Sequence, residues 1–324
     1  MVAVERAEIR EAIDQGFLQA TAEKVYRLLG VLREIQSLQE TKGKFTLKGG
    51  TALNVFHWPN VPRLSVDMDL MATGFPHAHP GSSERERAVA LVENAVKGIG
   101  YRVRRETADA GLTLRMSYLN SLGTRDQMKI DLDLLNRITL MPPALRTGPA
   151  IFHADDFTFP VVAEDELVGQ KLTAVAYRAA PRDLFDMYLI INAKWQQKPR
   201  SRSMYLAYSF LSDAEWYRLD YPVRLNVDYG PDKLEDVLRT TDGAPSLNPI
   251  KEAATVGLEK HEPSFIRATR EEQFLRKRLL KGERNAFAVI AGETDERRAR
   301  LLEVHPGLVW RLSQVRHSSA SEKT

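Results

Sequence analysis

The sequence contains no cysteine, which excludes disulfide bonds, a thiol nucleophile and cysteine-based metal sites. It also has no apolar run near the roughly 18–20 residues that a membrane-spanning helix needs. The N-terminal stretch MVAVERAEIREAIDQG mixes acids and bases and lacks the apolar core of a secretory signal. From these absences we expect a cytoplasmic protein that neither crosses nor binds a membrane.

The composition is that of an ordinary folded protein. Hydrophobic residues make up 43% of the 324 residues and charged residues 27%, which argues against a disordered chain. Domains most often have about 100–200 residues, so this length allows two of them. No internal repeat or low-complexity tract is visible.

The hydrophobic pattern changes along the chain. The first half shows helical periodicity over 17–39 and 83–98 and several short alternating segments typical of strands. From residue 164 onward the pattern is mainly helical, with a break at Ala180-Pro181. We therefore predict an α+β protein. It has a mixed-sheet domain over 1–163, a helical domain over 164–316 and a disordered tail over 317–324.

Two aspartates one residue apart form the first candidate site. Polar and apolar residues alternate in LSVDMDLM, residues 64–71, which predicts a strand with Asp67 and Asp69 on its polar face. Two carboxylates about 7 Å apart on a strand repel unless a cation lies between them, and Mg²⁺ prefers such oxygen ligands. A single pair of this kind is most often a surface feature, so it needs support from elsewhere.

A second acidic strand supplies that support. KIDLDLL, residues 129–135, places Lys129, Asp131 and Asp133 on one face. Beside the first strand it would complete three carboxylates, the ligand set of a two-metal site for phosphoryl transfer. We expect Asp131 to be the third metal ligand and keep Asp133 as the alternative. An edge strand with a polar solvent face would show the same pattern.

A glycine pair precedes both strands. Gly49 and Gly50 lack a Cβ, so their backbone can adopt unusual dihedral angles and approach a ligand closely. Thr51 then begins a predicted helix over 51–58, whose free N–H groups favour an anion such as a triphosphate. A simple strand-to-helix turn with Thr51 as N-cap explains the same residues. If Thr51 does lie beside the triphosphate, its phosphorylation would block nucleotide binding.

In combination these motifs resemble a known family. The GGT, the DMD and the later KIDLD are similar to the nucleotidyltransferase superfamily with the DNA polymerase β-like fold. Together with DELVGQKLTAVAYRAAPRDLFDMYLI, the pattern resembles the AbiEii/AbiGii toxins of bacterial toxin–antitoxin and phage-defence pairs, over roughly residues 45–312. The resemblance implies an NTP substrate, Mg²⁺ and a separately encoded antitoxin.

The resemblance also implies further site residues. Lys171 matches the family lysine, and Arg182, Asp183 and Asp186 match its RD..D element. Lys171 and Arg178 are seven residues apart on one helix face, from which both could meet the β- and γ-phosphates. We therefore expect Lys171 and Asp186 to act in catalysis with Asp67 and Asp69. An exposed lysine and an intrahelical salt bridge are the structural alternatives.

The predicted activity is transfer of NMP from an NTP to a hydroxyl acceptor. In the family the acceptor of some members is the 3′ end of tRNA, and such an addition blocks aminoacylation and growth. Basic stretches at 193–205 and 264–316, the latter with twelve Lys/Arg against seven acids, fit an RNA acceptor. Solvated helix faces explain them equally well. The alternatives are a small-molecule or protein acceptor, a non-catalytic NTP-binding module, and a purely structural helical protein.

Overall fold

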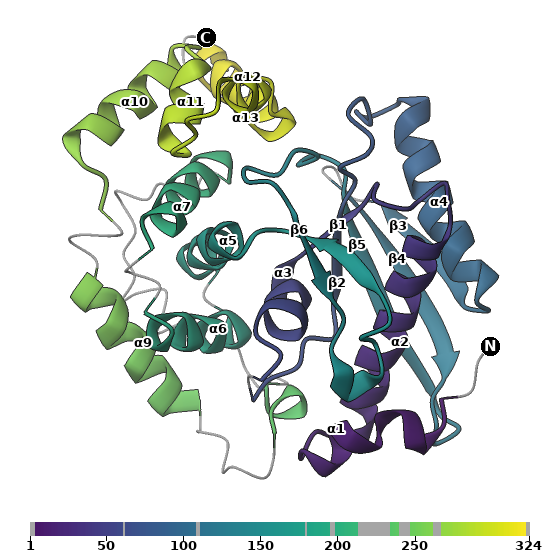
Figure 1. The fold of residues 1–324 in the computed structure, drawn as a ribbon. Helices are drawn as coiled ribbons and strands as arrows, with labels where there is room; N and C mark the ends of the chain where they lie inside the picture. The colour runs from purple at the N-terminus through teal and green to yellow at the C-terminus, as the bar shows by residue number, and fades with distance from the viewer. Residues whose placement is uncertain are drawn as a thin grey trace. The chain divides into compact units, whose positions relative to one another are not determined.

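The structure is a computed structural model that describes residues 4–60, 62–107, 111–178, 180–194, 198–212, 234–239, 247–261 and 267–321. The chain divides into two compact units. Unit 1 comprises Met1–Ala163 and Lys233–Ala244, and unit 2 comprises Glu164–Asp232 and Pro245–Thr324. Both are drawn in Figure 1.

Unit 1 is built on a seven-stranded mixed sheet in the order β3-β4-β5-β2-β1-β7-β6. Strand β2 pairs in parallel with β5, and β1 pairs in parallel with β7, while the other neighbours are antiparallel. The strands are β1 (Thr46–Lys48), β2 (Met68–Met71), β3 (Arg102–Thr107), β4 (Gly111–Leu119), β5 (Arg125–Asp133), β6 (Ala144–Thr147) and β7 (Thr158–Val161).

Strict alternation gives the central strands two different faces. Along β4 and β5 every second residue is buried, from Leu112 to Tyr118 and from Met128 to Leu132. The buried face packs against helices, because α4 (Ser83–Gly98) contacts β3 and β4, and α2 (Gln19–Ser37) contacts both α4 and β7. The residues between them, including Asp131, therefore lie together on the opposite face.

Short helical segments complete unit 1. Helix α3 (Gly49–Thr51) follows β1 directly and continues as the π-helical turn η2 (Ala52–His57). The other segments are η1 (Arg6–Ile9), α1 (Arg10–Asp14), η3 (Ala150–Phe152) and η5 (Glu235–Val237). Segment η5 belongs to unit 1 although described helices of unit 2 precede it in the chain, and an isolated bridge joins Arg63 to Leu238 beside it.

Unit 2 is helical throughout its described residues. Helix α5 packs against α7 and α6, and α6 packs against α9. The C-terminal helices α10 to α13 contact one another, and α11 and α13 also contact α7. The helices are α5 (Glu164–Tyr177), α6 (Pro181–Asn192), α7 (Pro199–Leu211), α9 (Leu247–His261), α10 (Arg270–Leu280), α11 (Asn285–Ile290), α12 (Glu296–Glu303) and α13 (Pro306–Ser321).

These elements confirm the predicted α+β class. Three local expectations differ from the structure. Strand β2 begins at Met68, so Asp67 lies just before it and not within it. Residues 144–147 form a strand, β6, that the sequence did not predict. Helix α13 continues to Ser321, into the tail that was expected to be disordered. Alternation locates a strand but not its end residues, because pairing with neighbours decides where it stops.

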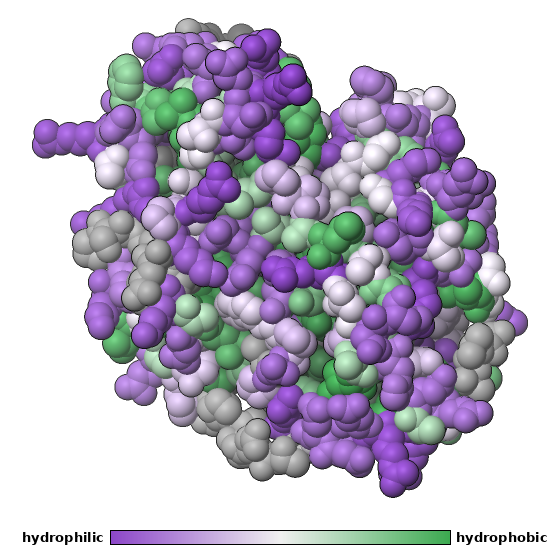
Figure 2. Space-filling view, viewed as in Figure 1, coloured by the Kyte–Doolittle hydropathy of each residue, from purple (hydrophilic) through white to green (hydrophobic). Residues whose placement is uncertain are grey.

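No helix among the described residues is long and apolar enough to cross a bilayer. The face of the molecule in Figure 2 is mostly hydrophilic, and hydrophobic residues are scattered over it in small groups. Small separate groups of this kind are normal on a protein surface.

Candidate active site

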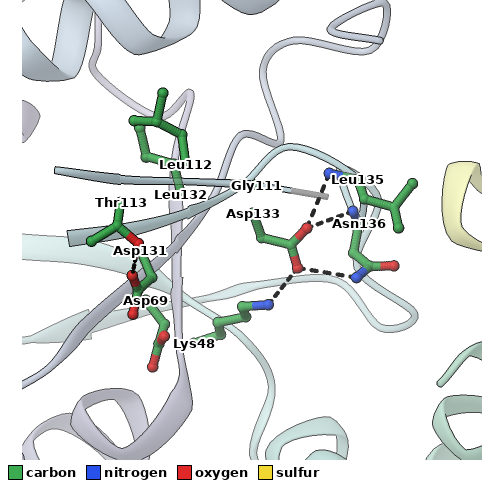
Figure 3. Close-up of a pocket in the computed structure, with 10 residues that line it drawn as sticks. All are labelled: Lys48, Asp69, Gly111, Leu112, Thr113, Asp131, Leu132, Asp133, Leu135 and Asn136. Carbon is green, nitrogen blue, oxygen red and sulfur yellow. Dashed lines mark hydrogen bonds and ion pairs between the residues drawn. The ribbon is translucent and has the colours of Figure 1, made fainter. Parts of the chain in front are cut away.

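Strand register brings the predicted carboxylates together. Asp69 on β2 pairs directly with Asp131 on β5, and both side chains lie on the face that the helices leave open. Figure 3 shows the two carboxylates beside each other, with the Thr113 hydroxyl donating to Asp131 Oδ1 at 2.6 Å. Asp67 precedes β2 on the same side, 3.9 Å from the Lys129 ammonium that also contacts Asp131.

Gly49 makes room for Asp69. Its φ of +74° is in the left-handed region, and a Cβ built there would lie 2.0 Å from Asp69 Oδ2. Glycine is thus required twice, once for the backbone angle and once for the close approach of a carboxylate. Gly50 is needed for a different reason, because its Cβ would lie 2.7 Å from Ser65 Oγ. The predicted unusual backbone of the glycine pair is confirmed at Gly49.

Asp133 is engaged in a separate network at the end of β5. It forms an ion pair with Lys48 and accepts hydrogen bonds from the backbone N–H groups of Leu135 and Asn136 and from the Asn136 side chain. Burial opposes the charged form of the carboxyl, but Lys48 and Asn136 outweigh it and lower the pKa of Asp133. Asp133 is thus held by Lys48 and Asn136 at the strand end, whereas Asp131, which accepts from Thr113 and Lys129, pairs with Asp69 across the strands.

Two lysines neutralise the cluster. Burial disfavours the Lys48 ammonium, but Asp133 and Asp69 outweigh it and raise the pKa of Lys48. On the other side, Lys129 Nζ lies 2.8 Å from Asp131 Oδ2. Burial likewise disfavours this ammonium, and its bond to Asp131 and the charge of Asp67 raise the pKa of Lys129. Within the described ranges no three acidic or histidine side chains converge in metal-binding geometry, and an ammonium lies among these carboxylates.

Thr51 does not cap the helix, and that expectation is wrong. The helix begins at Gly49, so Thr51 lies inside it with its side chain fully buried. Its hydroxyl donates to the carbonyl of Asp67 at 2.5 Å, which fixes the segment that carries this aspartate. A kinase cannot reach a hydroxyl with no exposed surface, so phosphorylation at this position is not supported.

Replacing Thr51 with valine is expected to destabilise unit 1. The change keeps the shape of the side chain but removes the hydroxyl that donates to the part-buried Asp67 carbonyl, at a cost of about 1–3 kcal/mol. Thr51→Ser keeps the hydroxyl and loses one methyl group, at a cost of about 1 kcal/mol. Urea denaturation of the three proteins measures the difference. A valine variant as stable as wild type would show that the hydrogen bond contributes nothing.

A cavity of about 290 Å³ opens beside the carboxylates. Its lining combines Asp69 and Asp131 with the Lys48–Asp133–Asn136 network, and the backbone of Gly111 borders it on β4. A Cβ on Gly111 would lie 2.8 Å from the carbonyl oxygen of Leu132, so this border depends on glycine. The cavity therefore places carboxylates, an ammonium and an amide around one space, a donor set suited to a charged ligand.

The residues predicted from the second half form their own cluster within unit 2. Lys171 Nζ on α5 lies 2.6 Å from Asp186 Oδ2 and 4.0 Å from Asp183 Oδ1, both on α6. Arg178 contacts both oxygens of Asp183, at 2.6 and 3.0 Å, while most of its side chain is exposed. Asp186 is fully buried and pairs with Lys171 on the neighbouring helix. An exposed salt bridge within α6 does not describe this contact.

Several basic residues in the predicted stretches of unit 2 are paired with acids. Ion pairs join Arg202 to Glu272, Arg278 to Glu283 and Arg298 to Glu293. Residues 195–197 and 264–266 lie outside the described residues. Because carboxylates already neutralise these arginines, the solvated-face explanation gains weight for them.

Sequence reasoning missed the roles of two lysines. Lys48 directly precedes Gly49, and its partner Asp133 is 85 residues away in sequence. Lys129 was placed on the polar face but not among the site residues. The sequence did offer a signal for both. Lys48 directly precedes the glycine pair and Lys129 begins the KIDLD motif, and carboxylates that a sheet brings together need nearby cations.

Comparisons with known proteins bear on the family and the fold. The family model described as "Nucleotidyl transferase AbiEii toxin, Type IV TA system" matches residues 31–288. No curated protein sequence matches the chain. Among solved structures, MenT4, a nucleotidyltransferase toxin from Mycobacterium tuberculosis H37Rv, has a similar fold, with a TM-score of 0.59 and 20% identity over 95% of this chain and 99% of that one. The predicted nucleotidyltransferase fold is thereby confirmed. The chain belongs to the AbiEii nucleotidyltransferase toxin family.

Proposed function

We propose that the protein transfers a nucleoside monophosphate from an NTP to the 3′-terminal hydroxyl of an RNA, with tRNA as the acceptor. The hydroxyl oxygen attacks the α-phosphorus, the bond from that phosphorus to the bridging oxygen breaks, and pyrophosphate leaves with the bond's electron pair. The hydroxyl proton passes to a neighbouring base. The observation that carries this proposal is the direct pairing of Asp69 with Asp131, at the point where Gly49 lets the backbone approach the Asp69 carboxylate.

We propose that these carboxylates bind a divalent cation. Asp67, Asp69 and Asp131 offer hard oxygen ligands on one side of the sheet, and the position of the Lys129 ammonium against two of them supports a cation site there. When bound, Mg²⁺ would supply charge neutralisation of the triphosphate and a more acidic attacking hydroxyl. We propose these three aspartates as its ligands and Asp133 as a structural residue that holds Lys48.

The protein's own groups orient the substrate. We propose that the backbone N–H groups of Gly49, Gly50 and Thr51 bind the triphosphate at the first turn of the helix. In unit 2, Lys171 acts as a point charge toward the phosphates, and the buried Asp186 fixes its ammonium. Arg178 would add a second cation, oriented by its bidentate contact with Asp183.

Modified tRNA could not accept an amino acid, so protein synthesis and growth would stop. This outcome accords with a family of toxins, and in phage defence it would limit infection. A cognate antitoxin, made separately in the same cytoplasm, would have to prevent it. Small-molecule and protein hydroxyls remain the competing acceptors, and the labelling experiment distinguishes them.

Incubation with total RNA, Mg²⁺ and each α-labelled NTP in turn tests the acceptor. We expect one or more of the NTPs to label an RNA of tRNA size on a denaturing gel. Periodate-oxidised RNA is the matched control, because it lacks the terminal hydroxyls and should take no label. If no NTP labels any RNA, the proposal that RNA is the acceptor is wrong. Equal labelling of oxidised RNA would place the modification away from the 3′ end.

A further inference from the structure

The face of the sheet that carries Asp131 continues as a row of cationic side chains. Register places Lys129 on β5 opposite Arg115 on β4, and Arg115 opposite Arg104 on β3. One row further from the carboxylates, Gln127 pairs with Ser117 and Ser117 with Arg102. Arg125 ends the face at the start of β5. We call Arg102, Arg104, Arg115, Arg125 and Lys129 the basic sheet face.

Most of these cations face water without an acidic partner. Arg102, Arg104, Arg115 and Arg125 are exposed. Among the described residues, Arg115 pairs with Glu106, but no acidic side chain lies within ion-pair distance of Arg102, Arg104 or Arg125. Arg105, which points to the helix side, pairs with both Glu86 and Glu93. Among the described residues of β3, the arginines of the basic sheet face thus lack the acidic partners that Arg105 has on the helix side.

The basic sheet face leads along β5 to the carboxylates of the candidate active site. Arg125 and Asp131 are six residues apart on one strand, which corresponds to about 20 Å. That length accommodates about six phosphates of a stacked single strand, at about 3.4 Å each. Tyr118 on β4 and Tyr101, directly before β3, are buried on the other face. A ligand of the basic sheet face must therefore be held through charge and hydrogen bonds rather than by base stacking.

We propose that the basic sheet face binds the phosphodiester backbone of the single-stranded 3′ segment of an RNA acceptor and guides its terminal hydroxyl toward Asp131 and Asp69. This proposal rests on the proposed function. Guanidinium groups bind phosphate with paired hydrogen bonds, and Ser117 and Gln127 add neutral donors between them. Because phosphates and not bases are contacted, recognition along this face is independent of sequence and depends steeply on salt.

Fluorescence anisotropy of the full chain with a fluorescein-labelled, unstructured 12-nucleotide RNA tests the proposal. The Arg102→Gln/Arg104→Gln variant is compared with wild type over a series of KCl concentrations. The control is Arg87→Gln/Lys42→Gln, which removes the same charge from two exposed residues, one on α4 and one before β1. We expect roughly tenfold weaker binding by the first variant only. Its slope of log affinity against log salt should fall by about 1.4, or about 0.7 for each lost phosphate contact.

Separate outcomes distinguish the two proposals. If wild type labels RNA and the Arg102→Gln/Arg104→Gln variant binds the probe as tightly as the control, the basic sheet face is wrong and the proposed function stands. If wild type neither binds nor labels RNA, both fail. Competition by poly-glutamate as strong as that by RNA would overturn the proposal in favour of an acidic protein partner. Unchanged NTP affinity of the variant shows that the loss concerns the acceptor.

Discussion

Replacing Asp69 with asparagine is expected to lower the rate of nucleotidyl transfer at least about a thousandfold, or by about 4 kcal/mol of transition-state stabilisation. The reason is the loss of a charged oxygen ligand from the carboxylate pair with Asp131, while the shape beside Gly49 is kept. Stability should change by less than about 1 kcal/mol. Removing the charge relieves repulsion from Asp131 but also removes attraction to Lys48 and Lys129, so the two effects offset each other.

Asp133→Asn is the matched variant for this experiment, because it removes the same charge from the adjacent position on the same face. Here we expect a loss of stability of about 2 kcal/mol, since Lys48 loses its ion-pair partner, with measurable transfer retained. Transfer rates under saturating NTP and urea midpoints separate the two effects. A folded Asp133→Asn protein as inactive as Asp69→Asn would make Asp133 the third ligand in place of Asp131.

The second large effect is expected at Gly49. In Gly49→Ala the new methyl group would lie 2.0 Å from Asp69 Oδ2, so the carboxylate or the turn must move. The φ of +74° adds strain of about 1–2 kcal/mol for any residue with a Cβ. We expect the transfer rate to fall at least about a hundredfold, because displacements of about 1 Å at a reacting centre have effects of that size.

Gly43→Ala separates strain from displacement. Gly43 has a similar φ of +70°, but nothing lies within 4 Å of the position that an alanine methyl group would take there. Its substitution should cost only the backbone strain and leave the transfer rate of the folded protein intact. Rates normalised to the folded fraction give the comparison. If Gly49→Ala and Gly43→Ala lose the same small amount of activity, the approach of Asp69 to Gly49 has no part in catalysis.

The sequence predicted the sheet and its acidic face because both depend on a local period of two. Alternation in KIDLD put Asp131 and Asp133 on one face, but it could not separate them, since their difference depends on Lys48 and Asn136. Pairing between β2 and β5 joins segments about sixty residues apart, and only the fold assigns Asp131 to Asp69. Local signals also failed at Thr51. A hydroxyl near the start of a helix is compatible with capping. The group to which the Thr51 hydroxyl donates instead, the Asp67 carbonyl, lies 16 residues further along the chain.

Charge shows the same limit. The count of basic residues favours unit 2 as the surface for RNA, but ion pairs such as Arg202–Glu272 neutralise part of that charge. The basic sheet face could not be recognised from the sequence, because Arg102, Arg104 and Arg105 stand together in a short strand. Only the register shows that two of them share a face with Asp131 and that the third contacts α4.

The most direct test of nucleotidyl transfer at these carboxylates compares the fate of the α-phosphate of an NTP with the fate of its γ-phosphate. Wild type and Asp69→Asn are incubated with RNA, Mg²⁺ and an NTP labelled at either the α- or the γ-phosphate, and pyrophosphate release is measured in parallel. We expect RNA to take label from the α-phosphate only, with one pyrophosphate per nucleotide added, and Asp69→Asn to yield neither. Label from the γ-phosphate, or undiminished α-labelling by Asp69→Asn, would contradict nucleotidyl transfer at this site.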